Sequence, residues 1–327
     1  MGRGRKNGFK PEEFGERFLA EDFTVIYRQC IKEFRETIAL RDFIDLAKSF
    51  NKGVKSYRLA DATSMPGFKQ YIWLDDREEK AINVAFEGNE IQGMYIKPYI
   101  TYPKSDNQFT KTEFIMPIAE DWFVFWGGKN EFINYHYTYE QQRYAYDLVV
   151  LKNGQTYRNQ GLRNEDYYAF GKKVVAPAEG KVIRKVDGIA DNPLGEMNES
   201  NPAGNYIVLE HEPNEYSLLA HFKRGSIGVR EGDKVECGQF LGRCGNSGNS
   251  SEAHIHFQVM DSPEMDQGIS LNIRFKDGLE PIQGDTVHAA VMEKKPQKLD
   301  AFDKAEVAFS LSDFFLFIPR LLRQLFK

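Results

Sequence analysis

The stretch Ser250-Ser251-Glu252-Ala253-His254-Ile255-His256-Phe257-Gln258-Val259 predicts a β-strand around which the second half of this chain is organised. Apolar and polar residues alternate along it, which is typical of a strand with one buried face. Residues two apart on a strand share a face, so His254 and His256 point one way and the apolar residues between and after them point the other. The preceding run Gly245-Asn246-Ser247-Gly248-Asn249 predicts a tight loop that leads into the strand.

Four of the six histidines, with one aspartate, lie where they can converge on one site. His136 shortly precedes Asp147, and His221 ends an apolar run that predicts another strand. With His254 and His256 they supply four imidazoles and one carboxylate, which are ligands that zinc favours. A catalytic zinc uses three protein ligands and keeps one open position, so two histidines would remain for acid–base chemistry. The alternative for the pair on the strand is two ordinary surface histidines.

A series of short motifs between residues 119 and 275 strengthens the metal interpretation. In chain order the motifs are Asn134-Tyr135-His136, Tyr144-Ala145-Tyr146-Asp147, Ala176-Pro177-Ala178-Glu179-Gly180, Gly204-Asn205-Tyr206, Ala220-His221-Phe222, Gly232-Asp233-Lys234-Val235, Gly245-Asn246-Ser247-Gly248 and His254-Ile255-His256-Phe257. In this order they resemble the lysostaphin-type, or LytM-like, zinc endopeptidases, which cut peptides in bacterial cell walls. The resemblance implies a mainly-β antiparallel zinc peptidase domain over 119–275.

The resemblance also implies a role for each candidate site residue. The zinc ligands of the family map onto His136, Asp147 and His256, and its two catalytic histidines map onto His221 and His254. The best-known members space the first histidine and the aspartate four positions apart, whereas ten residues separate them here. The segment between them must therefore loop out and return. The acidic residue Glu140 in this insert is the alternative third ligand.

The mechanism implied is hydrolysis of a peptide bond in a peptidoglycan stem or cross-bridge by a zinc-activated water, assisted by two histidines. Two other classes of protein are weighed against it. Biotin- and lipoyl-carrier domains use hairpins similar to Ala176-Pro177-Ala178-Glu179-Gly180. Interpreting this chain as a carrier domain, however, leaves its four clustered histidines unexplained. Some relatives of the zinc peptidases lost ligands and regulate cell-wall amidases without catalysis. Here every ligand and catalytic position is filled.

Composition bounds the remaining possibilities. A chain of 327 residues fits about two domains. Its net charge of −5 argues against binding nucleic acid. No run of about 18 apolar residues predicts a spanning helix, and the basic first residues are not followed by the apolar stretch of a signal peptide. The resemblance nevertheless implies a location outside the cytoplasm or in the cell envelope. The three cysteines are expected to be buried free thiols, and His211 and His288 to be solvated.

Residues 1–100 predict a separate α+β domain. Helical spacing of apolar residues runs from about 12 to 50, with a second helix beginning at Thr37 and ending near Gly53. A period of two then predicts four short strands, over 55–59, 67–74, 80–86 and 91–96. Helices followed by an antiparallel sheet resemble the cone-like fold of the nuclear transport factor two type. We expect this domain to act as a spacer or to position substrate, and 101–118 to be a linker.

Residues 276–327 predict a polar linker followed by an amphipathic C-terminal helix. Apolar residues recur with helical spacing in the last part of the chain, with Arg320, Arg323 and Lys327 among them. Such a helix suits an anionic membrane surface. Docking on its own domain or on a second copy is the alternative, and the oligomeric state is not predicted.

The membrane alternative predicts that the full chain floats with anionic vesicles in a density gradient, because a basic apolar stripe binds anionic lipid. A chain ending at Asp300 is expected to stay at the bottom. Neutral vesicles provide the control. Equal flotation of both forms would rule out the membrane role and leave docking or oligomerisation.

Overall fold

The computed structural model describes residues 8–289, which divide into two compact units, 8–100 and 101–289. The C-terminal helix expected from the sequence lies outside the described residues. Between residues 8 and 289, no helix is long and apolar enough to cross a membrane.

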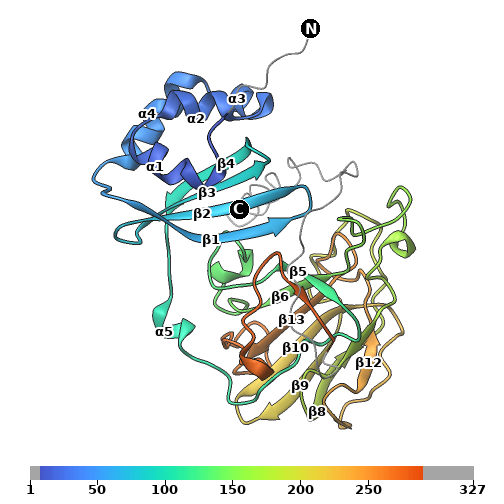
Figure 1. Cartoon of the computed structure of the whole chain (residues 1–327). Helices are drawn as coiled ribbons and strands as arrows, with labels where there is room; N and C mark the ends of the chain where they lie inside the picture. The colour runs from blue at the N-terminus through green and yellow to red at the C-terminus, as the bar shows by residue number, and fades with distance from the viewer. Residues whose placement is uncertain (1–7, 290–327) are drawn as a thin grey trace. The chain divides into compact units, whose positions relative to one another are not determined.

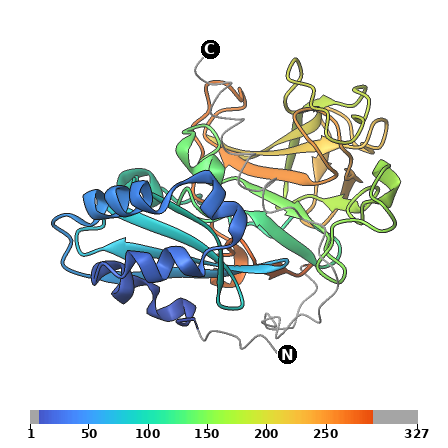
Figure 2. The ribbon, with the colours of Figure 1, turned by 90° about the horizontal axis from the view of Figure 1, so that it is seen from above.

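The first unit packs short helices on a four-stranded antiparallel sheet (Figure 1). Seen from above, the blue helices lie over one face of the strands (Figure 2). The helices are η1 (Pro11–Glu13), α1 (Phe14–Leu19), α2 (Phe23–Gln29), α3 (Lys32–Thr37) and α4 (Leu40–Asn51). The strands, in sheet order, are β1 (Tyr57–Met65), β2 (Phe68–Asp75), β3 (Lys80–Glu87) and β4 (Glu90–Pro98). The four strands and the α+β class are thus confirmed, while the likeness to the nuclear transport factor two type stays a prediction.

Aromatic side chains spaced four apart explain how α1 packs. Phe14 and Phe18 are fully buried and lie on one face of the helix. Between them, Gly15 permits a close approach, because a Cβ there would lie 2.6 Å from the Trp73 ring. At the end of the helix, the Asn51 amide of α4 donates to the Phe18 carbonyl at 3.2 Å. Helix α1 therefore packs closely against the sheet at Trp73 and is hydrogen-bonded to α4.

The predicted helix through residues 23–34 is wrong in one respect, since it is split into α2 and α3. Cys30 forms a parallel bridge with Ile91 of β4, and the Ile31 amide donates to the Ile91 carbonyl at 2.9 Å. Backbone groups of Cys30 and Ile31 that pair with β4 are not available for the hydrogen bonds of a continuous helix. Apolar spacing continues across the break, so the sequence pattern does not reveal it. The following helix begins at Leu40 rather than Thr37.

The second unit is built on a large antiparallel sheet. Its strands, in spatial order, are β11 (Lys234–Val235), β8 (Gly180–Val186), β9 (Asn205–Glu212), β10 (Glu215–Phe222), β13 (Ile255–Met260), β6 (Tyr146–Val149), β5 (Trp122–Trp126) and β14 (Thr286–Val287). A second pair joins β12 (Phe240–Arg243) to β7 (Lys173–Val175). The short helices are α5 (Pro103–Asp106), η2 (Tyr135–Thr138), η3 (Asn164–Asp166) and η4 (Lys276–Gly278). The mainly-β antiparallel expectation is confirmed.

The core of this unit lies under the strand that the sequence singles out. Ile255, Phe257 and Val259 of β13 are fully buried in one apolar cluster. His256 and Gln258, which alternate with them, occupy the opposite face. The strand is central, with β10 on one side and β6 on the other. Burial of its apolar face therefore fixes the register that presents the histidine.

The segment 101–118 packs as part of the second unit. Phe114, Met116 and Ile118 are buried in its core. The Phe114 amide donates to the Arg274 carbonyl at 2.9 Å, and its carbonyl accepts from the Lys276 amide at 2.8 Å. This stretch therefore contributes apolar side chains and backbone pairing to the second unit.

Two expectations about single side chains are wrong. His211 is not solvated, because its ring nitrogens lie 2.6 Å from the Glu179 carbonyl and 2.7 Å from the Ser217 hydroxyl. Burial lowers the pKa of this imidazole. Cys237 is exposed, whereas Cys30 and Cys244 are the buried free thiols expected.

Glu215 fastens the segment 101–118 to β10 and provides a stability prediction. This buried carboxylate accepts hydrogen bonds from the backbone amides of Lys111 and Thr112. Glu215→Gln replaces one acceptor with a donor, so one amide loses its partner. We expect a loss of about 1–3 kcal/mol in the free energy of unfolding by chemical denaturation. Glu212→Gln, on an exposed position of the same hairpin, is the control. Equal stability of the two variants would contradict this role.

Candidate metal centre

The site begins with a cross-strand pair. His256 on β13 lies directly opposite Asp147 on β6 in the antiparallel register, so their Cβ atoms are close neighbours. His256 Nδ1 lies 2.9 Å from Asp147 Oδ1. Both side chains are buried. The sheet alone therefore brings together two of the three groups expected to bind metal.

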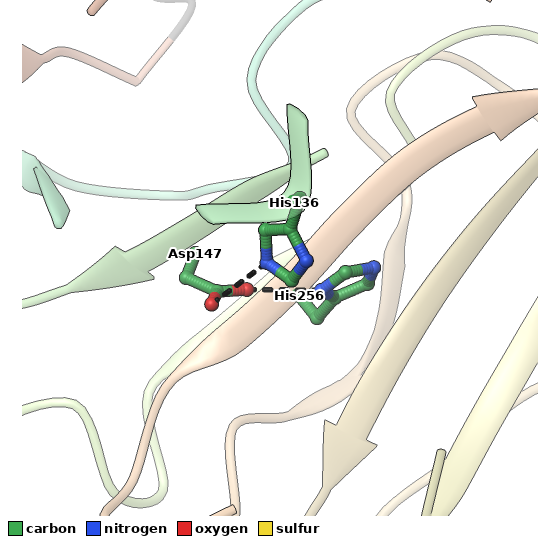
Figure 3. Close-up of side chains that lie close together, drawn as sticks. All are labelled: His136, Asp147 and His256. Carbon is green, nitrogen blue, oxygen red and sulfur yellow. Dashed lines mark hydrogen bonds and ion pairs between the residues drawn. The ribbon is translucent and has the colours of Figure 1, made fainter. Parts of the chain in front are cut away.

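The third group, His136, is delivered by the loop before the insert. It lies in η2, where Asn134 caps the turn by accepting from the His136 amide at 3.2 Å. The fully buried Asn134 amide group also donates to the carbonyls of Arg143 and Ala145. One side chain therefore joins the beginning of the insert to its end. His136 Nε2 consequently lies 3.0 Å from Asp147 Oδ2 (Figure 3).

The hydrogen bonds on the far side of each ring assign the tautomers. His136 Nδ1 lies 2.8 Å from Gln142 Oε1, and His256 Nε2 lies 2.8 Å from Gln258 Oε1. The Gln258 amide nitrogen donates to the Gln141 carbonyl, which orients its oxygen toward the ring. When a metal is bound, each neutral imidazole keeps its one proton for the glutamine, and the other nitrogen directs its lone pair at the metal. Without metal, the nitrogen that faces Asp147 must carry a proton to hydrogen-bond to the carboxylate.

A ring nitrogen this close to a carboxylate oxygen needs either a proton or a metal cation between the two atoms. One potential ligand atom from each of His136, Asp147 and His256 lies within 4.8 Å of the others. Tetrahedral zinc ligands at about 2.0–2.2 Å from the metal lie about 3.3 Å apart. The donor types, their spacing and the directions of the lone pairs therefore fit one zinc ion. Glu140, the alternative ligand, is exposed on the insert and is not part of this group.

Charge supports the same arrangement. Burial opposes ionisation of Asp147, but charge and hydrogen bonds from the adjacent His136 and His256 hold the pKa of its carboxyl well below the usual range. Burial also opposes a charge on His256, yet the hydrogen bond to Asp147 raises the pKa of that imidazole. Burial lowers the pKa of His136. The site therefore holds an anionic carboxylate in a dry setting, where a cation is attracted more strongly than in water.

A backbone irregularity brings His221 to the same face. Strict alternation after Leu219, a core residue, would place His221 in the core as well. Instead β10 has a register shift against β9 there, and His221 adopts a left-handed conformation with φ 69°. Phe222 then enters the core, and the His221 ring lies 4.6 Å from the His254 ring, centroid to centroid. The strain thus re-aims the imidazole.

His221 and His254 both keep one ring nitrogen available. His221 Nδ1 donates to the Ser247 carbonyl at 2.8 Å, and His254 Nδ1 donates to the Glu252 carbonyl at 2.9 Å. The Nε2 atoms are therefore the unprotonated ones in neutral rings. Burial, aided by the neighbouring His254, keeps the pKa of His221 well below its usual value. His254 Nε2 lies 3.8 Å from Asp147 Oδ1, so the pair borders the metal group.

All five residues singled out from the sequence thus lie in one cluster, but their supporting residues were missed. Gln258 could have been found, since it follows His256 by two positions on one strand face. Gln142 gave no such signal, because the path of the insert cannot be derived from spacing. No sequence signal indicates the left-handed conformation of His221 either.

A family model matches part of the second unit. The model of peptidase family M23 matches residues 165–270, a range that includes His221, His254 and His256 but not His136 or Asp147. Lipoprotein NlpD of Yersinia enterocolitica is 32% identical over 89 residues, which make up 27% of this chain and 77% of the relative. The chain belongs to peptidase family M23.

Further M23-like proteins match over shorter or more divergent regions. Peptidoglycan DD-endopeptidase ShyA of Vibrio cholerae is 34% identical over 65 residues, 20% of this chain, and the chain spans only 15% of that relative. The solved catalytic domain of the antimicrobial peptidase lysostaphin from Staphylococcus simulans is 21% identical with a TM-score of 0.26, over 52% of this chain and 95% of that one.

The strained backbone of this M23 domain predicts an unusual order of stability at position 221. Glycine adopts a positive φ without the steric cost that a Cβ brings, about 1 kcal/mol. His221→Gly should therefore unfold at higher denaturant than His221→Ala. At Ala220, which has no positive φ, Ala220→Gly should instead destabilise. A His221→Ala variant as stable as His221→Gly would contradict the strain.

Proposed function

We propose that this chain is a zinc-dependent endopeptidase that hydrolyses peptide bonds of bacterial peptidoglycan. The observation that carries the proposal is the convergence of four imidazoles and one carboxylate, with three groups directed at one point and two bordering it. Membership of peptidase family M23 supports the reaction class.

His136 Nε2, an Asp147 oxygen and His256 Nδ1 are the proposed ligands of the zinc ion. When bound, zinc supplies a Lewis acid that lowers the pKa of water to about 7 and polarises a carbonyl group. The protein supplies the geometry: two ligands are fixed by strand register and the third by the Asn134 cap. The glutamines that accept from the two rings hold each imidazole in the tautomer that binds metal.

His221 and His254 are the proposed acid–base pair. Each fixes its Nδ1 proton on a backbone carbonyl, so each presents Nε2 as a proton acceptor in the neutral state. One of them takes a proton from the attacking water, and the other stabilises the oxyanion or protonates the leaving amine. Their order is left open. No glutamate base is needed in this scheme.

The substrate and the setting are inferred from the relatives. ShyA is named for peptidoglycan endopeptidase activity, which supports a peptidoglycan peptide as substrate and a location outside the cytoplasm. We propose that the first unit has a fold like that of the nuclear transport factor two type. Its proposed role is to act as a spacer or to position substrate. The second candidate function is non-catalytic regulation of cell-wall amidases.

Separate variants should distinguish ligands from catalysts in the full chain. His136→Ala, Asp147→Ala and His256→Ala each remove one of three protein ligands, so zinc content and hydrolysis should fall together. His221→Gly and His254→Ala should keep near-normal zinc and lose about 10²- to 10⁴-fold in rate. Zinc is measured by metal analysis, and hydrolysis by release of dye from labelled, purified cell walls.

His288→Ala is the matched control, because His288 pairs with Asp121 at 2.8 Å and lies outside the cluster. It should keep both zinc and activity. Full zinc and activity in Asp147→Ala would place the third ligand elsewhere. A wild-type chain that binds no metal and leaves walls intact would overturn the enzyme and favour the regulator.

A further inference from the structure

The ten-residue insert between His136 and Asp147 supports both proposed metal-binding histidines on their outer nitrogens, His136 directly and His256 through Gln258. Gln142, on the insert, accepts from His136 Nδ1 at 2.8 Å. The neighbouring Gln141 carbonyl accepts from the Gln258 amide at 3.0 Å, and Gln258 in turn accepts from His256 Nε2. Two consecutive insert residues therefore orient the two rings. Such outer partners tune metal affinity by fixing tautomer and ring direction.

A carboxylate from outside the insert holds this loop near both of its ends. Asp106, the last residue of α5, accepts from the Tyr137 hydroxyl at 2.9 Å and from the Tyr144 hydroxyl at 2.7 Å. Tyr137 follows His136 directly, and Tyr144 stands three positions before Asp147. Both tyrosine side chains are buried. Asp106 therefore bridges the start and the end of the loop with two charge-assisted bonds.

Further contacts reinforce the clamp, by which we mean Asp106 and its hydrogen bonds to Tyr137 and Tyr144. The Tyr102 amide donates to the Tyr137 hydroxyl at 3.2 Å, so that hydroxyl both accepts and donates. The guanidinium of Arg143 lies 3.5 Å from the Tyr102 ring centroid, and its Nε donates to the Tyr137 carbonyl at 3.1 Å. Arg143 is itself buried. The stretch 102–106 thus holds the insert through side-chain, backbone and cation–π contacts.

We infer that Asp106 is a positioning residue for the metal centre. It contacts neither a ligand nor a reacting group, and it acts by holding the insert so that Gln141 and Gln142 stay against the two histidine systems. The inference rests on the proposed metal site but concerns metal affinity, which is measured without substrate. The extended spacing between His136 and Asp147 thereby gains a function, since the added residues supply the support of both rings.

The test is a zinc titration of the full chain against a chromophoric chelator. Asp106→Ala should lower zinc affinity about 10- to 100-fold, the usual range for loss of outer support. Gln142→Ala should lower it by a similar factor. Because both variants weaken the support of the His136 ring, their combined effect should be less than additive. Tyr137→Phe with Tyr144→Phe removes only the two hydroxyls, so it tests the clamp if Asp106→Ala fails to fold.

Asp187→Ala is the matched control in the same unit. Asp187 likewise accepts two hydrogen bonds, here from the backbone amides of Gly225 at 2.8 Å and Ile227 at 3.2 Å, and none of these residues belongs to the insert. It should lower the melting temperature of the metal-free chain without changing zinc affinity. Zinc affinity at the wild-type level in both Asp106→Ala and the double tyrosine variant would overturn the inference. A wild-type chain without zinc affinity would instead overturn the proposed function.

Discussion

The placement of one buried carboxylate between two imidazoles is the constraint on which the site depends. Asp147 is in contact with His136 through one oxygen and with His256 through the other. A buried anion without such partners would be strongly unfavourable. A cation at the centre satisfies all three groups together. The proposed metal site therefore forms where the sheet, which carries Asp147 and His256, meets the loop capped by Asn134, which carries His136.

The protein uses different devices to place each group, and they differ in strength. Strand register fixes His256 opposite Asp147, and this register is supported by the buried apolar face of β13. His136 depends on a loop, which is why the Asn134 cap and the supports of the insert matter. His221 depends on strained backbone, which the neighbouring core residue Phe222 stabilises. Rigid and strained elements together hold the cluster within a mainly apolar unit.

Much of this arrangement could be predicted from the sequence, because strand periodicity is local. The alternation around His254 and His256 correctly predicts which face carries them, and the four strands of the first unit follow from the same signal. The break at Cys30 could not be predicted because it depends on pairing with a distant strand. The positive φ of His221 could not be predicted either, because it accompanies a register shift between β9 and β10 that residue spacing does not reveal. The position of Gln142 likewise depends on tertiary folding of an irregular loop. Packing, rather than residue preference, decides these features.

X-ray absorption at the zinc edge of the zinc-loaded full chain tests the central claim most directly, because it reports the atoms bound to the metal. The account predicts a shell of nitrogen and oxygen at about 2.0–2.1 Å, with outer-shell scattering from two imidazoles. Because His256→Ala should bind less zinc, its spectrum is recorded on the zinc that remains bound, and that spectrum should show scattering from one imidazole fewer. A sulfur shell at about 2.3 Å, or a spectrum that does not change in that variant, would contradict the assignment of His136, Asp147 and His256 as the metal site.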